Sequence, residues 1–162
     1  MNKSSQSVIK LAISFAATFA AAGIGSLGMT GENTWQWYEQ LNKPFFQPPD
    51  WLFGPVWTVL YISMAIAVFL VWQRGFDKKN VRAAMLLFAV QLILNSFWTV
   101  IFFGMQSTLG GLIEIFILLA AIVLTIIQFK KVSTAAAILM LPYLAWVIFA
   151  TLLNCSIYIL NR

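Results

Sequence analysis

Five long apolar segments constrain the fold of this chain more than any other feature of its sequence. A helix that crosses a bilayer needs about 20 consecutive apolar residues. The segments of that length cover residues 8–27, 51–72, 83–103, 107–129 and 134–160. With 61% hydrophobic and 9% charged residues, the chain is more apolar than a soluble core of 162 residues requires. We therefore predict an all-α membrane protein, a single domain over residues 1–162 built as a bundle of five transmembrane helices.

The first apolar segment allows two interpretations. Lys3 and Lys10 precede an apolar stretch that ends in small residues at 20–23, a pattern also typical of a cleavable signal peptide. The apolar character nevertheless continues to Met29. We expect the segment to be retained as the first transmembrane helix. Its Ala- and Gly-rich face would then pack against neighbouring helices or a second protomer, or serve only as filler.

The basic residues are distributed unevenly along the chain. If the N-terminus is cytoplasmic, only Lys43 and Arg162 of the ten Lys and Arg residues lie outside, and a long outer loop over residues 28–50 joins the first two spans. The net charge of +5 then reflects the orientation of the chain in the membrane. The sequence has no basic patch of the kind that binds nucleic acid. Because the termini are short, we expect an integral protein of a bacterial cell envelope, in the plasma membrane rather than the outer membrane.

Missing residue types narrow the possible chemistry. The chain has no histidine, which excludes imidazole metal sites, a Ser-His or Cys-His catalytic pair and a histidine-ligated haem. Its single cysteine, Cys155, cannot form an internal disulfide. No Gly-rich phosphate loop followed by Lys-Ser/Thr is present, so nucleotide-driven transport is not indicated. We expect no metal site and no required cofactor.

The stretch LNKPFFQPPDWLFGPVWTVLY, which begins at residue 41, combines prolines with a dense group of aromatic residues. Pro44, Pro48 and Pro49 cannot continue a helix, so residues 43–50 are expected to form an extended loop. Pro55 falls in the first turn of the second span, where its missing N–H costs nothing. An aromatic stripe then follows at helical spacing through Phe53, Trp57, Tyr61 and Met64. A rigid loop that leads into an aromatic helix face predicts the mouth of a binding site.

Other spans carry polar and aromatic residues on single faces. They are Gln91, Asn95, Trp98 and Phe102 in the third span, and Tyr143, Trp146, Ala150 and Asn154 in the fifth, behind a kink expected from Pro142. A short helix from Asn33 or Thr34 through Gln40 would place further aromatics at headgroup level. We expect an aromatic pocket on the side of the proline-rich loop, capped by residues 35–51. The alternative is that these amides only bridge helices, at about 0.6 kcal/mol each, and that the tryptophans only pack.

These residues and spacings resemble the TspO/MBR family, the tryptophan-rich sensory protein/translocator protein family, also called peripheral-type benzodiazepine receptor-like. The family pattern W-Y-x-x-L-x-K-P-x-W-x-P-P-x-W-x-F-x-P-V-W-x-x-L-Y resembles residues 37–61, except that Phe46 stands where the family usually has Trp. Asn95 and Trp98 resemble the family's Asn-x-x-Trp pair. Residues 142–154 resemble its P-Y-L-x-W-x-x-F-A-T-x-L-N segment.

The resemblance implies a five-helix bundle, usually a homodimer, that binds porphyrins, sterols and isoquinoline- or benzodiazepine-type ligands. It would act as a sensor, sequestering or transport protein for tetrapyrroles such as protoporphyrin IX. Such a macrocycle would stack on indole and phenol rings, with its carboxylates near the interface and in reach of Lys43 or indole N–H groups. The expected ligand contacts are Trp37, Pro44, Phe46, Trp51, Phe53, Trp57, Tyr61, Asn95, Trp98, Tyr143, Trp146, Ala150 and Asn154.

Two alternative functions remain open at this stage. The first is an enzyme that degrades porphyrin with light and oxygen, since Trp57 and Trp146 resemble positions implicated in that reaction in some family members. The second is a general carrier of small amphiphiles, for which porphyrin would be incidental.

Two elements have more than one interpretation. Glu114 is the only carboxylate inside a span, and is either functional or a neutral carboxyl group bonded to another helix. Leu153, Tyr158 and Arg162 satisfy a loose cholesterol-recognition pattern, although Cys155 stands where animal relatives place the Tyr of that pattern. A helix end whose Tyr and Arg reach toward the interface explains these residues equally well.

Overall fold

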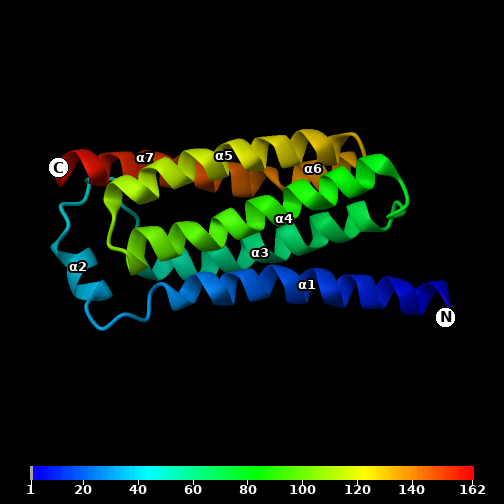
Figure 1. Ribbon diagram of the computed structural model, residues 1–162, viewed down its shortest axis with the longest axis horizontal. Helices are drawn as coiled ribbons and strands as arrows, with labels where there is room; N and C mark the ends of the chain where they lie inside the picture. Colours follow the sequence, from blue (N-terminus) through cyan, green and yellow to red (C-terminus); the bar gives the residue numbers. More distant parts are fainter. Residues whose placement is uncertain (1) are drawn as a thin grey trace.

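The computed structural model describes residues 2–162, apart from the side chain of Lys3, and this part of the chain contains helices and no strands. Long helices run side by side along one axis, and α2 closes one end of the bundle (Figure 1). The five candidate membrane spans are Ser4–Leu27, Asp50–Trp72, Lys79–Gly104, Thr108–Lys130 and Thr134–Leu160. The predicted all-α transmembrane bundle is therefore confirmed, and the chain is an integral membrane protein.

The connection between the first two spans is not one open loop. α1 (Lys3–Leu27) is followed by the short helix α2 (Thr34–Gln40), so the helix expected inside this connection is confirmed. Beyond α2 the backbone N–H of Gln47 donates to the Pro44 carbonyl at 3.1 Å. This hydrogen bond closes a turn, so the prediction of a uniformly extended segment after α2 was wrong. The chain then enters α3 (Asp50–Trp72) directly behind Pro49.

The third span ends in a π-helical turn that the sequence analysis did not predict. α4 (Lys79–Thr99) continues into η1 (Val100–Gly104), where the Met105 N–H donates to the Val100 carbonyl at 2.9 Å. The wider turn brings Phe102 and Phe103 against each other, with ring centroids 4.9 Å apart. Single π turns are frequent at functional sites.

The last two spans are antiparallel neighbours joined by a tight turn. α5 (Thr108–Lys130) leads through that turn into α6 (Thr134–Leu139). The single residue Met140 separates α6 from α7 (Leu141–Leu160). Pro142 lies in the first turn of α7, where its missing N–H breaks no hydrogen bond of α7 itself. It cannot, however, continue the helical ladder of α6. The sequence predicted a kink from Pro142, and the structure interrupts the helix two residues earlier, at Met140.

Small residues let α1 approach α4 closely. The Ser96 hydroxyl of α4 donates to the Ala21 carbonyl of α1 at 2.8 Å. A Cβ added at Gly25 would lie 3.5 Å from the Ser96 Cα, and one added at Gly28 only 2.8 Å from the Val100 Cα. The small face of α1 therefore packs against neighbouring helices. Retention of the first span stays a prediction.

Candidate functional site: an aromatic cavity

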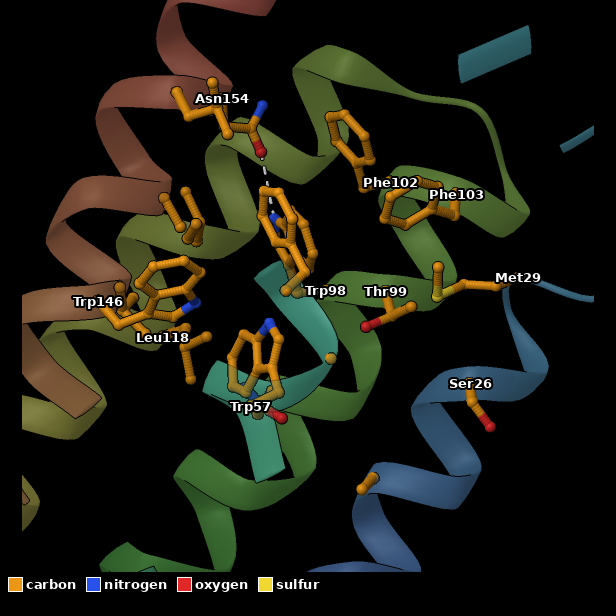
Figure 2. A pocket seen from close by; sticks show the side chains of 18 of the residues that line it. Ser26, Met29, Trp57, Trp98, Thr99, Phe102, Phe103, Leu118, Trp146 and Asn154 are labelled. Atoms are coloured by element: carbon orange, nitrogen blue, oxygen red, sulfur yellow. Dashed lines mark hydrogen bonds between the residues drawn. The ribbon is translucent and has the colours of Figure 1, made fainter. Parts of the chain in front are cut away.

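A cavity of about 380 Å³ lies inside the bundle at the end that α2 covers. Its volume falls within the range of small-molecule pockets, roughly 300–1,000 Å³. Figure 2 shows Trp57, Trp98 and Trp146 around one space, each on a different helix. These helices are α3, α4 and α7, so the aromatic faces predicted on separate spans meet in the bundle.

Eight of the predicted ligand contacts line this cavity. They are Phe53, Trp57, Tyr61, Asn95, Trp98, Trp146, Ala150 and Asn154. Helical spacing had placed the residues of each span on one face of that span. The packing of the spans turns these faces toward the same space. Their role in ligand binding stays a prediction.

Tyr143 lies behind the wall of the cavity instead of lining it. Its ring is fully buried and contacts that of Trp57, with centroids 6.1 Å apart. Its hydroxyl accepts a hydrogen bond from Asn95 Nδ2 at 3.2 Å, and the Asn95 Oδ1 accepts one from the Tyr61 hydroxyl at 2.6 Å. Tyr143 therefore holds Asn95 and Trp57 in position from behind.

Four further predicted contacts also lie outside the cavity lining. Trp51 is 73% exposed, because it sits about 160° around α3 from Phe53, which faces the cavity. Trp37 packs its ring on Phe102, with centroids 5.6 Å apart. Pro44 and Phe46 belong to the segment behind α2. The Phe46 ring contacts Phe149 at 6.3 Å, so the departure from the family pattern at this position does not alter the cavity lining.

Two tryptophan N–H groups of the cavity differ in their bonding. Trp98 Nε1 donates to Asn154 Oδ1 at 3.1 Å, and Asn154 Nδ2 donates to the Thr108 carbonyl at 3.2 Å (Figure 2). This pair bridges α4, α7 and the start of α5. The Asn154 amide therefore acts as an interhelical bridge, as the alternative interpretation of the amides predicted. The buried Nε1 of Trp146 has no partner among the described residues. Of the three central tryptophans, Trp98 thus has its N–H bonded to another helix, whereas the N–H of Trp146 is a buried donor without a partner.

Several lining residues were not among the predicted ligand contacts. The largest are aromatic and come from the cap and the π turn: Trp35, Tyr38, Phe102 and Phe103. Of these, only Phe102 had been expected on the pocket-forming face of its span. The rings of Tyr38 and Phe103 lie 5.2 Å apart, and those of Trp35 and Phe103 lie 6.2 Å apart. Trp35 and Tyr38 are three residues apart on a helix, a spacing that could have identified them as one face. No pattern in the sequence predicts the π turn that brings Phe103 beside Phe102.

One negative and one positive side chain lie in or against the wall of the cavity. Among the described residues that line the cavity, Asp50 alone carries a charge. The Lys43 ammonium sits 3.9 Å from the centroid of the Tyr38 ring, and Gln47 Nε2 donates to the Tyr38 hydroxyl at 3.3 Å. Burial, reinforced by the nearby Asp50 carboxylate, raises the pKa of Tyr38 to about 12, although the Gln47 hydrogen bond opposes this rise. Tyr38 is therefore neutral at physiological pH and serves as a flat apolar wall.

Glu114 and Gln91 are buried polar residues inside the spans. Both carboxyl oxygens of Glu114 and both amide atoms of Gln91 lack hydrogen-bond partners among the described residues. Neither side chain belongs to the cavity lining, although Gln91 was expected on the face of Asn95 that points there. The interhelical bond proposed for a neutral Glu114 is thus not formed in this structure.

The three residues of the loose cholesterol pattern do not form one surface. Leu153 is buried and lines the cavity, whereas Tyr158 is half-buried and Arg162 is exposed beyond the end of α7. Leu153 and Tyr158 point about 140° apart around the helix, because they are five residues apart. The structure therefore does not bring this element together on a single helix face.

Fold and site together define a class, the integral membrane proteins whose five-span bundle holds a covered aromatic cavity at one end. The sequence model of the TspO/MBR family matches residues 13–160, and the chain belongs to this family. It is 44% identical over 161 residues to the Tryptophan-rich protein TspO of Chlorobaculum tepidum, covering 99% of each chain. The protein of the same name from Archaeoglobus fulgidus is 43% identical over 95% of this chain and 98% of its own. The Translocator protein of Homo sapiens is 39% identical over 83% of this chain and 80% of its own.

Proposed function

We propose that this protein binds a flat, apolar tetrapyrrole such as protoporphyrin IX in the aromatic cavity. The observation that carries the proposal is the convergence of Trp57, Trp98 and Trp146 from three helices on one space. Each stacking contact between aromatic rings contributes about 0.5–1.5 kcal/mol beyond the burial of apolar area. Sterols and isoquinoline-type molecules share the apolar, ring-based character that this lining accommodates.

The protein acts, in this proposal, as a sensor, sequestering or transport protein for its ligand. Relatives of the chain carry the names Translocator protein and Tryptophan-rich sensory protein, the latter in Cereibacter sphaeroides at 36% identity. Those names support a role in sensing or moving a ligand. The helical cap over the cavity fits such a role, because a ligand held beneath it is separated from water until the cap opens.

The assembly and location are part of the same proposal. We place the protein in a bacterial plasma membrane, and we propose a homodimer, as the family resemblance implies. An apolar groove between α1 and α4, lined by small residues such as Ala17, Ala20 and Ala89, supports close contact with a second helix surface.

A titration in the dark tests the binding function. Purified protein in detergent would be titrated with protoporphyrin IX and followed by quenching of tryptophan fluorescence. We expect saturable binding that weakens by up to about 13-fold in each of Trp57→Phe and Trp146→Phe, because the smaller phenyl ring offers less stacking surface. Trp51→Phe is the matched control, since Trp51 is largely exposed outside the cavity. Quenching that never saturates, or that ignores both cavity substitutions, would mean that the tryptophans only pack.

The same samples separate binding from degradation. Two tryptophans beside one bound macrocycle could also support a reaction with light and oxygen. Irreversible loss of the porphyrin spectrum on illumination, abolished in the Trp57→Phe, Trp146→Phe double variant, would favour the enzyme. A spectrum that survives illumination of the bound complex would favour the binding protein.

A further inference from the structure

The cavity lining carries no positive charge among the described residues, and its single charged group is the Asp50 carboxylate. A carboxylate of a ligand placed inside this cavity would lose its hydration without gaining a cation. It would also meet a like charge at Asp50, which is unfavourable at short range. An acidic ligand can therefore place only its apolar part inside, and its carboxylates must stay at the mouth.

Lys43 is a cation that contacts a residue of the cavity wall. Its ammonium lies 3.9 Å from the centroid of the Tyr38 ring, and Tyr38 is a wall of the cavity. Only one aromatic ring thus separates the positive charge from the enclosed space. Contact with the ring face leaves the hydrogen-bond donors of the ammonium available to another acceptor.

The backbone on both sides of Lys43 is held in place. The Asn42 N–H donates to Asn161 Oδ1 at 2.9 Å, and Asn161 Nδ2 donates back to the Asn42 carbonyl at 2.9 Å. On the other side, Pro44 restricts Lys43 to extended backbone conformations. A positioned cation costs less ordering on binding than a free surface lysine, so the mouth presents a prepared site for an anion.

We propose that Lys43 recognises the carboxylate of an acidic amphiphile whose apolar ring system occupies the cavity, while Asp50 prevents the carboxylate from entering. This inference rests on the proposed function and deepens it by assigning orientation and ligand class. The ligand lies with its rings among the tryptophans and its acidic edge at Tyr38, on the side where α2 closes the bundle. Ligands that bear carboxylates at one edge are thereby preferred over fully apolar analogues.

Two porphyrins that differ only in charge test the inference. Protoporphyrin IX carries two carboxyl groups, which are masked in its dimethyl ester. Both would be titrated in the dark into the wild type, Lys43→Gln, Lys43→Arg, Asp50→Asn and Lys130→Gln, the last as a control at the far end of the bundle. We expect Lys43→Gln to weaken the diacid about three- to fivefold and to leave the diester within about twofold. Lys43→Arg should retain the preference, and Asp50→Asn should tighten binding of the diacid.

Salt provides a second readout that a purely structural role of Lys43 would not change. Binding of the diacid to the wild type should weaken as ionic strength rises, and this dependence should largely disappear in Lys43→Gln. Equal weakening of diacid and diester in Lys43→Gln would overturn the inference, because Lys43 would then act only by supporting Tyr38. No effect on either ligand would overturn it as well. If the wild type binds neither porphyrin saturably, the proposed function itself fails, and the inference fails with it.

Discussion

Gly28 shows how one missing side chain decides the position of a whole helix. It closes α1 where that helix meets η1, and a Cβ at this position would meet the backbone of Val100 at 2.8 Å. Backbone atoms cannot rotate away as a flexible side chain can. The close contact of the first span with the π turn therefore depends on glycine at residue 28.

We expect Gly28→Ala to destabilise the protein by about 1–3 kcal/mol, the usual effect of overpacking. A thermal or denaturant melt in detergent, followed by circular dichroism, measures the change. Gly23→Ala is the matched control on the same helix, because its new methyl group would meet no atom within 4 Å. The control should be neutral or stabilising by about 0.5–1 kcal/mol, as for Gly-to-Ala changes in helices generally. Equal melting of the two variants would contradict the close packing at residue 28.

Residues of the cavity differ in how far the sequence could place them. Phe53, Trp57 and Tyr61 recur at helical spacing on α3, so their shared face was predictable, and all three line the cavity. Tyr143 also shared a face with cavity residues of α7, yet it lies behind the wall. A helical face spans a wide arc, and only the neighbouring helices decide which part of that arc meets the open space.

At the scale of elements, α2 and the segments on either side of it form the cap of the cavity. The cap covers residues 28–49, and Met29, Trp35 and Tyr38 are its contribution to the lining. It is tied to the far end of the chain by the reciprocal hydrogen bonds between Asn42 and Asn161. Opening the cap at this side must break these bonds, which join residues 119 positions apart.

We expect Asn161→Ala to loosen the cap without changing the cavity lining. Each neutral hydrogen bond contributes about 0.5–1.5 kcal/mol, so loss of the reciprocal pair should favour opening by about 1–3 kcal/mol. Faster hydrogen–deuterium exchange of amides in residues 34–47, with no change in α5, would show this. Asn33→Ala is the control within the cap, because the Asn33 side chain makes no capping hydrogen bond. Identical exchange in wild type and Asn161→Ala would show that the hydrogen bonds between Asn42 and Asn161 do not hold the cap closed.

At the scale of the whole molecule, the two ends of the bundle differ in charge. The end opposite α2 carries the loop between α3 and α4 and the turn between α5 and α6 (Figure 1). The basic residues at that end include Lys10, Arg74, Lys78, Lys79, Arg82, Lys130 and Lys131. Positively charged loops remain in the cytoplasm, so the cap should face outward.

Accessible cysteines test this orientation. In a Cys155→Ser background, Asn80→Cys marks the basic end and Gln40→Cys marks the cap, and both positions are exposed. A membrane-impermeant maleimide added to intact spheroplasts should label only the cap position. Labelling of the basic end should require disruption of the membrane. The reverse pattern would show that the cap faces the cytoplasm.

The sequence by itself determined the features that depend on local composition. The spans follow from the length of their apolar runs, and the break before α7 follows from the missing N–H of Pro142. The aromatic faces follow from the helical repeat, and family membership follows from motifs that cover nearly the whole chain. The spans, the break and the aromatic faces are each read within a few turns of one helix.

Only the tertiary structure decided which residues enclose the cavity. It turned Trp51 outward, brought Trp35, Tyr38 and Asp50 into the lining, and placed Lys43 against the Tyr38 ring. These outcomes depend on the rotation and relative height of packed helices, and on a π turn at the end of the third span. In lipid, the hydrophobic effect hardly distinguishes one apolar helix face from another. Close packing and interhelical hydrogen bonds therefore make that choice, and they exist only once the helices have assembled.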